Sequence, residues 1–412
     1  MRTLERNAVL AILAAVVLLL WAYPWLEGHR LALNGRVEKG PEYLVTSSLD
    51  SGPGSLRAAV FAALRSDQPA VIIIRPAEIV VQNPLPPLVS AQHIVLRSEH
   101  GRSEIDASAL RGSPLFDVRG DSAAFENLAI RGASATAIRA SGAGRVALDD
   151  VRVAGSSVGL SAAGEVEVKV SQVEFVDNGI GMELTGEGRT QIADSVFKDQ
   201  RNAGIWFVPG AGAAGSTEIA NATFEGGRYG LVLGNGRTEV RSSAIRGFGD
   251  DGILALGGSL DVSGSRIGDG SGAGVRAAGV ESIAFTDNEI FDVRGMGMLL
   301  QAVESAVVDD NRLFRNGYGI ATVTSAPAAV KLTNNLLVAQ ALDGVILFGD
   351  SPIVTGNRAL RNGAAGIRVL NLKAFGTYTR SLPLLADNVL RDNHPDQPEL
   401  GEFVLETPRG AR

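Results

Sequence analysis

The chain has 412 residues, 50 glycines, no cysteine and a formal net charge of −7. The lack of cysteine excludes disulfides, thiolate metal sites and a lipoprotein anchor, and the acidic balance argues against a nucleic-acid partner. Hydrophobic residues make up 45% of the sequence and aromatic residues only 5%. These proportions indicate a narrow core of small aliphatic side chains and many turns.

The chain begins with an apolar stretch that is long enough to cross a bilayer. It runs from Ala8 to Trp25 and follows Arg2 and Arg6, which places the positive charges on the cytoplasmic side. A cleaved signal peptide is the alternative, although no small-x-small site follows the stretch. We predict a transmembrane anchor over residues 1–26 and a polar linker over residues 27–42. The protein would then span the inner membrane once and face the periplasm.

A short helix is predicted at the start of the main domain, within a cap over residues 43–76. A turn over Asp50–Gly54 precedes Ser55, which is a good N-cap residue. A solenoid must cover its open end, where unpaired strand backbone invites aggregation, and an amphipathic helix does this. The residues on the apolar face of this helix are Leu56, Ala59, Val60, Ala63 and Leu64.

The rest of the chain repeats one phrase, a small residue followed by an aliphatic one, about every 22 residues. Such a steady period means a solenoid. Short alternating strings between the pairs predict strands rather than helices. The pairs are Ala137-Ile138, Gly159-Leu160, Gly181-Met182, Gly204-Ile205, Gly230-Leu231, Gly252-Ile253, Gly274-Val275, Gly297-Met298, Gly319-Ile320, Gly344-Val345 and Gly366-Ile367.

The fold class that follows is all-β, a parallel β-helix of about 11–13 coils, right-handed because crossovers between parallel strands almost always are. The coils extend to residue 394, and residues 395–412 form a C-terminal tail. A ladder of turn asparagines supports the register, and we expect them to satisfy backbone groups rather than bind a ligand. We expect positive φ angles at Asn316-Gly317 and Asn362-Gly363. The ladder consists of Asn288, Asn311, Asn335, Asn357 and Asn388.

The N-terminal third resembles pectate-lyase-like β-helix proteins. The resemblance rests on VTSSLDSGPGSLRAAV, EIVVQNPLPPLVSAQHIVLRS and SEIDASAL, between Tyr43 and Arg131. It implies the β-helix fold and a polysaccharide context, and it does not imply activity. Pectate lyases have a Trp-Ile-Asp-His-type segment where this chain has residues 147–150, Ala-Leu-Asp-Asp. Mannuronan epimerases have Asp-Pro-His-Asp after a Gly-Ile pair, where this chain has residues 321–324, Ala-Thr-Val-Thr.

One outward ladder predicted from the register carries a stripe of acids. It runs through Lys169, Gln191 and then Glu218, Glu239 and Asp261. Stacked like charges repel unless something compensates them. Calcium bound by the three acids is one compensation. Arg241 on the neighbouring ladder is another, and Arg241 could also orient an acidic sugar. A solvated surface stripe without a ligand remains open.

A second outward ladder takes the residue after each small-aliphatic pair and is apolar in its middle. Trp206, Val232, Leu254 and Leu299 belong to it. An outward apolar row means a binding surface or a covered one, and Trp206 could stack on a sugar ring. A register error or a covering loop is the alternative.

We therefore expect a membrane-anchored β-helix that binds or processes an acidic polysaccharide, with lyase chemistry if it is catalytic. In that account Glu218, Glu239 and Asp261 hold calcium, Arg241 is the base or clamp, and Trp206 and Lys169 contact the substrate. The alternative is a non-catalytic scaffold in envelope or exopolysaccharide assembly, with an envelope protein as partner.

Overall fold

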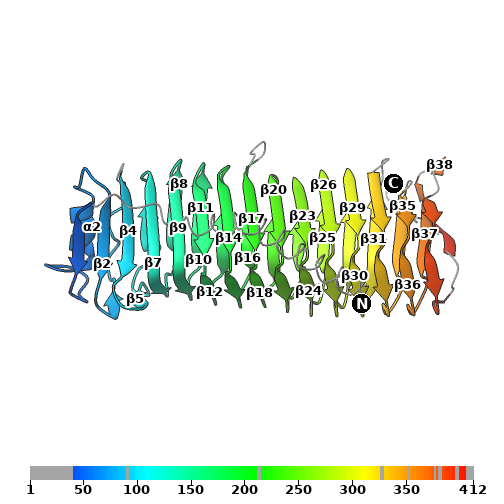
Figure 1. Cartoon of the computed structure of the whole chain (residues 1–412), viewed down its shortest axis with the longest axis horizontal. Helices are drawn as coiled ribbons and strands as arrows, with labels where there is room; N and C mark the ends of the chain where they lie inside the picture. The colour runs from blue at the N-terminus through cyan, green and yellow to red at the C-terminus, as the bar shows by residue number, and fades with distance from the viewer. Residues whose placement is uncertain are drawn as a thin grey trace, which may run out of the picture.

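The computed structural model describes residues 40–89, 92–210, 215–324, 329–349, 352–374, 377–378, 383–394 and 399–404. These residues wind into a rod of about twelve coils, stacked from the N-terminal to the C-terminal end (Figure 1). Each coil contributes strands to three faces, which we call face 1, face 2 and face 3. The predicted β-helix is confirmed.

Faces 1 and 2 form a 27-stranded sheet and face 3 a 14-stranded sheet among the described residues. Adjacent coils pair in parallel, and the long strands β7 (Ser122–Arg131) and β9 (Arg145–Ala154) cross from face 1 to face 2. The other strands of face 1 are β1 (Glu42–Val45), β2 (Ala70–Ile74), β4 (His93–Ser98), β11 (Glu167–Ser171), β14 (Arg189–Ala193), β17 (Ser216–Ala220), β20 (Arg237–Arg241), β23 (Ser259–Ser263), β26 (Ser282–Thr286), β29 (Ser305–Asp309), β32 (Ala329–Thr333), β35 (Ile353–Thr355) and β39 (Leu384–Ala386).

Face 2 has the shortest strands and face 3 carries the small-aliphatic pairs. The other strands of face 2 are β3 (Glu78–Val80), β5 (Ser103–Asp106), β12 (Glu174–Val176), β15 (Val196–Lys198), β18 (Thr223–Glu225), β21 (Ala244–Arg246), β24 (Arg266–Gly268), β27 (Glu289–Phe291), β30 (Arg312–Phe314), β33 (Leu336–Val338), β36 (Arg358–Leu360) and β40 (Val389–Arg391). Face 3 consists of β6 (Phe116–Val118), β8 (Thr136–Gly142), β10 (Val158–Gly164), β13 (Ile180–Leu184), β16 (Ala203–Phe207), β19 (Tyr229–Leu233), β22 (Ile253–Ala255), β25 (Val275–Ala278), β28 (Met296–Gln301), β31 (Tyr318–Thr324), β34 (Val345–Gly349), β37 (Ile367–Ala374), β38 (Thr377–Tyr378) and β41 (Glu399–Val404).

The core fills the inside of the coils with one aliphatic or aromatic side chain above another. Phe175, Phe197 and Phe224 on face 2 stack with ring centroids 5.0 and 4.7 Å apart. The alternation of buried and outward residues along each strand is the period of two that the sequence predicts. Consequently, every second residue of each face points away from the core, and those that nothing covers are available for binding.

Buried amides tie the coils together at the corners. The backbone N–H of Asn311 donates to Asn335 Oδ1 at 3.0 Å, and its side-chain amide donates to the carbonyl of Phe285 at 2.9 Å. The same pattern continues through Asn357, so the predicted structural role of the asparagine ladder is confirmed.

The expectation about Asn316-Gly317 and Asn362-Gly363 is wrong. The positive φ angles belong to the residues one position earlier, Arg315 (φ 55°) and Arg361 (φ 54°). Asn316 and Asn362 are instead buried and accept from backbone N–H groups of the preceding coil, as the ladder at the other corner does.

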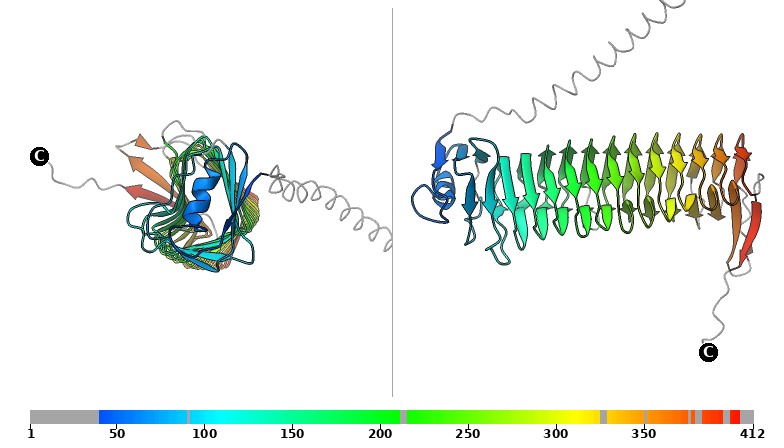
Figure 2. Two further views of the ribbon diagram at one scale, coloured as in Figure 1. Left: turned by 90° about the vertical axis from the view of Figure 1, so that its left-hand side faces the viewer. Right: turned by 90° about the horizontal axis from the view of Figure 1, so that it is seen from below.

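The N-terminal opening is covered by α2 (Leu56–Ala63), which lies across the end of the coils in the end-on view (Figure 2). The Ser55 side chain accepts a hydrogen bond from the N–H of Ala58 at 3.2 Å, as an N-cap residue does. Leu56 and Val60 are fully buried in the main core. The predicted cap helix, its N-cap residue and the burial of Leu56, Ala59, Val60 and Ala63 are therefore confirmed, whereas Leu64 lies just beyond the helix and is half-buried.

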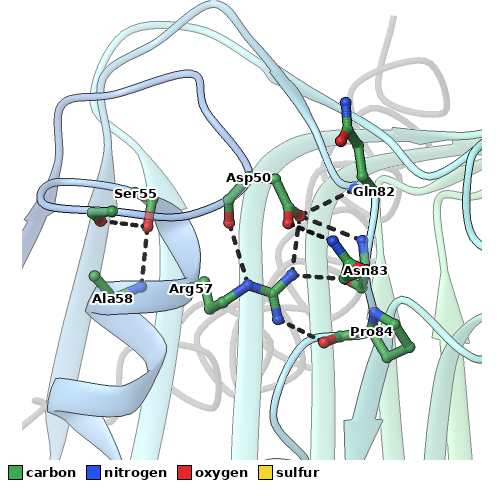
Figure 3. Close-up of polar contacts among 8 residues, drawn as sticks. Asp50, Ser55, Arg57, Ala58, Gln82, Asn83 and Pro84 are labelled. Atoms are coloured by element: carbon green, nitrogen blue, oxygen red, sulfur yellow. Dashed lines mark hydrogen bonds and ion pairs between the residues drawn. The ribbon is translucent and has the colours of Figure 1, made fainter.

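A polar cluster fixes the loop before this helix (Figure 3). Arg57 donates to Asp50 Oδ1 at 2.9 Å and to the carbonyls of Asn83 and Pro84. Burial raises the pKa of Asp50, but hydrogen bonds from Asn83, Gln82 and Arg57 outweigh it and hold that pKa below its ordinary value. The ionised carboxylate thus anchors the cap to the second coil.

The predicted transmembrane helix and inner-membrane location are corrected here. Within the described residues the structure has one helix, the eight-residue α2, and no helix long and apolar enough to cross a membrane. The stretch Ala8–Trp25, on which both predictions rested, lies outside the described residues. We therefore state the fold as an all-β solenoid with a capping helix, and we do not retain the membrane anchor or the periplasmic location.

Candidate functional site

The predicted acidic stripe lies on the outer side of face 1. Lys169 pairs with Gln191, Gln191 with Glu218, Glu218 with Glu239, and Glu239 with Asp261, on five successive coils. Equivalent residues of paired strands are about 4.8 Å apart. The register predicted from the sequence is therefore confirmed, whereas the roles given to these residues remain predictions.

Arginines of the same face pair with two of the three acids of the stripe, Glu218 and Glu239. Glu239 accepts hydrogen bonds from Arg237 and Arg241, one on each carboxylate oxygen. Glu218 accepts from Arg189 at 2.6 Å and from Gln191 at 3.2 Å, again on separate oxygens. The repulsion expected between stacked carboxylates is thus compensated by the chain itself.

The electrostatics of Glu218 reflect these contacts. Burial raises its pKa, but hydrogen bonds from Gln191 and Arg189 and the charges of Arg189 and Arg241 outweigh burial and hold the pKa below its ordinary value. The acid is ionised and already paired. Lys169, two coils away, lies 3.5 Å from Glu167 on its own strand.

A calcium ion does not fit this arrangement. Four carboxylate oxygens of Glu218 and Glu239 already accept hydrogen bonds, whereas calcium needs such oxygens as ligands. Nowhere in the described part of the chain do three His, Asp or Glu residues come together in a way that could hold a metal ion. Arg241 also cannot act as a base, because a guanidinium stays protonated in proteins.

What the stripe does form is an open depression of about 300 Å³. Its walls come from β14, β17 and β20, and Arg237, Arg241 and Arg189 around it are 67%, 59% and 55% exposed. Outward guanidinium groups that bond on one side to a carboxylate still have free N–H donors toward solvent. The residues that line the depression are Arg189, Ser216, Thr217, Glu218, Arg237 and Glu239.

Sequence reasoning missed Arg189 and Arg237. The signal was present, because Arg237-Thr-Glu-Val-Arg241 alternates on a strand and its first, third and fifth residues must share the outward side. The same alternation on each coil of face 1 gives a further outward ladder, beside the ladder of the acids and the ladder of Arg241. Arg189, Ser216 and Arg237 belong to it.

Trp206 lies on a different face from the acids. It is half-buried on β16 of face 3, between Glu183 and Val232 of the adjacent coils. The outward apolar ladder has the predicted register, but Val232 and Leu299 are only 2% and 7% exposed. The structure therefore does not bring Trp206 together with Lys169 or the acidic stripe.

The C-terminal part of that apolar ladder forms a small hydrophobic cluster of its own. Leu299, Ala321 and Ile346 are buried outside the main core, and partly buried side chains such as Tyr318 pack against them. This part of the ladder is covered rather than open to a ligand.

Comparison with known proteins agrees with this architecture. Residues 210–359 match the family model described as right handed beta helix region. The match covers 150 of the 412 residues and supports the right-handed parallel β-helix fold of the chain. A search of curated proteins gives no match.

Two solved structures show the same fold at low sequence identity. The catalytic unit of the thermostable GH87 α-1,3-glucanase of Streptomyces thermodiastaticus is 15% identical, with a TM-score of 0.55, covering 88% of this β-helix and 70% of the glucanase chain. The A-module of a mannuronan C-5 epimerase of Azotobacter vinelandii is 14% identical, with a TM-score of 0.53, covering 88% and 98%. Both neighbours are polysaccharide-acting β-helix proteins, and at this identity the likeness concerns the fold.

Proposed function

We propose that this β-helix binds an acidic polysaccharide along the outer side of face 1. The observation that carries the proposal is the depression between β14, β17 and β20. Arg189 projects there from β14 and Arg237 from β20, two coils apart, beside Glu218 and Glu239, and Arg241 lies at the other end of β20. Guanidinium groups bind carboxylates in a bidentate manner, and the glutamates can accept hydrogen bonds from sugar hydroxyls.

The geometry supports binding rather than turnover. The depression offers ion-paired carboxylates and permanently protonated guanidinium groups, and neither is suited to take a proton from a sugar carbon at neutral pH. The polysaccharide-acting neighbours make a glycan a reasonable ligand class, although they share only the fold with this chain. A binding module of this kind also fits the scaffold role in exopolysaccharide assembly.

Titration calorimetry of the purified protein with polygalacturonate tests the proposal. We expect Arg237→Gln/Arg241→Gln to weaken binding at least tenfold. Neutral dextran should not bind to either protein. A matched control is Arg65→Gln/Arg111→Gln, which removes the same charge from exposed arginines on the N-terminal coils. Wild-type binding that the depression variant leaves unchanged would reject this site.

A further inference from the structure

Of the four face-2 strands nearest the C-terminal end, three carry arginine as their only charged residue and the fourth, β33, carries no charge. The strands β30, β33, β36 and β40 read Arg-Leu-Phe, Leu-Leu-Val, Arg-Ala-Leu and Val-Leu-Arg. Arg312, Arg358 and Arg391 on them are exposed, and none forms an ion pair with another described residue. Unpaired arginines are unexpected in a chain with a net charge of −7.

A second row of arginines runs along the following corner. Arg315 and Arg361 occupy equivalent corner positions two coils apart. Arg315 pairs with Asp292 at 2.6 Å, whereas Arg361 is exposed and has no ion pair within the described chain. One acid lies on the surface itself: Glu289 is in register with Arg312 on the adjacent strand β27 and is paired with Arg266 at 2.6 Å. The other acids, Asp310, Asp387 and Asp392, lie at the corners, and the described residues give none of these three an ion pair.

Between the two rows lies a depression of about 460 Å³ with an apolar floor. Phe314 stacks on Phe291 at 5.5 Å between centroids, and the guanidinium of Arg315 lies 4.7 Å from the Phe314 ring centroid. Leu336 and Val338 continue the floor on the next coil and are half-buried. A rigid floor flanked by cations fits a ring that is apolar on one side and negatively charged at its edge.

The spacing of the arginines points to a linear polymer. Arg312 and Arg358 are separated by one intervening coil, as are Arg315 and Arg361, so each row repeats after about 10 Å, twice the strand spacing. That distance is close to the length of two linked sugar rings in an extended chain. Every second sugar of a polyuronate could therefore present its carboxylate to the next arginine of a row.

We infer that face 2 carries a second glycan site, formed by Arg312, Arg358, Arg361 and Phe314, for a strand of a uronate polymer lying parallel to the solenoid axis. The inference takes its ligand class from the proposed function but uses another face and other residues. An anionic bilayer is a poorer occupant, because the apolar side chains sit in a depression instead of projecting outward, as insertion into a membrane requires.

The test compares polygalacturonate binding by the wild-type protein and by Arg312→Gln/Arg358→Gln, with Arg65→Gln/Arg111→Gln as the charge-matched control. We expect the face-2 variant to bind at least tenfold more weakly and the control within twofold of wild type. Both substitutions lie at exposed positions where the described part of the structure has no ion pair, so equal melting temperatures should accompany the loss. Digalacturonate should bind weakly and a hexamer far more tightly. The arginines of each row lie two coils apart, so only a longer oligomer can reach several of them.

The outcomes separate this inference from the proposed function. Loss in Arg312→Gln/Arg358→Gln but not in Arg237→Gln/Arg241→Gln supports the face-2 site and rejects the depression on face 1. The converse result overturns the face-2 site and leaves the proposed function standing, and wild-type protein that binds no polyuronate overturns both. Tighter binding of dextran sulfate than of polygalacturonate, or binding to anionic phosphatidylglycerol vesicles without binding to the polymer, would also contradict a uronate site.

Discussion

The arginines at the two ends of face 2 differ in whether they form ion pairs. On the N-terminal coils Arg102, just before β5, bonds to Asp150 at 2.5 Å and to Glu174 at 2.7 Å, which ties its coil to the second and third coils after it. On the C-terminal coils Arg358 lies on the same face without a carboxylate partner in the described chain. On this face, an arginine that holds two carboxylates of other coils stabilises the fold, whereas an unpaired arginine keeps all of its N–H donors for a ligand. The following predictions test this contrast.

The largest effect is expected at the N-terminal cap. Leu56 is 1% exposed over the first coils, so Leu56→Ala should lower the free energy of unfolding by about 2–5 kcal/mol, as other core truncations do. Leu49→Ala is the control, because Leu49 is 68% exposed in the loop before the helix. Denaturant unfolding measures both, and an unchanged midpoint for Leu56→Ala would show that α2 does not close the core.

The second effect separates paired from unpaired arginines directly. Arg102→Gln should reduce stability by on the order of 1 kcal/mol, because it removes a partly buried guanidinium that holds two carboxylates. Arg358→Gln should leave stability within about 0.5 kcal/mol of wild type, as changes at unengaged surface sites do. Equal losses in thermal unfolding would mean that Arg358 has an internal role and is not free for a ligand.

A third prediction compares the pKa values of two stacked pairs of acids on face 1. Glu126 and Asp149 pair across adjacent strands as Glu218 and Glu239 do. Burial raises the pKa of Glu126, the charge of Arg97 opposes this, and the charge of Asp149 adds to it, with a net rise. The net result for Glu218 is the opposite, because arginines and Gln191 outweigh burial.

The sign of the pH effect follows from that rise. A carboxyl group whose pKa is raised in the folded state adds to the free energy of unfolding. This addition is fully present below the unfolded-state pKa and is lost as the pH rises through the folded-state pKa. Glu126→Gln should therefore be slightly more stable than wild type at about pH 7 and equal to it at about pH 3. Glu187→Gln, at an exposed position, should show no such difference, and a neutral-pH loss in Glu126→Gln would contradict the assignment.

The smallest expected effect is that of calcium. Because arginines and Gln191 occupy the oxygens of Glu218 and Glu239, millimolar calcium should leave the melting temperature of the wild-type protein unchanged relative to chelator. A ligand that binds only the folded state must raise it by mass action. A rise that Glu239→Gln abolishes would restore the calcium site predicted from the sequence.

Much of the fold could be predicted because it repeats. The small-aliphatic pairs fix the register, and from the register follow the stacking of Glu218 on Glu239 and the buried asparagine ladder. What could not be predicted is which charges meet. Arg241 reaches Glu239 on its own strand, whereas Arg358 reaches no acid among the described residues, and this depends on side-chain length and neighbouring corners rather than on the repeat. The transmembrane anchor predicted at Ala8–Trp25 illustrates another limit, since that prediction rested only on hydropathy and flanking charges.

Footprinting of arginines tests the central claim, glycan binding by solvent-exposed guanidinium groups, most directly. The full-length protein is treated with an arginine-selective dicarbonyl reagent in the presence of polygalacturonate or dextran, and each modified residue is quantified by mass spectrometry. Polygalacturonate, and not dextran, should protect Arg237 and Arg241 on face 1 and Arg312 and Arg358 on face 2, and leave Arg65 as reactive as before. Equal modification of all five residues with either polymer would contradict the account.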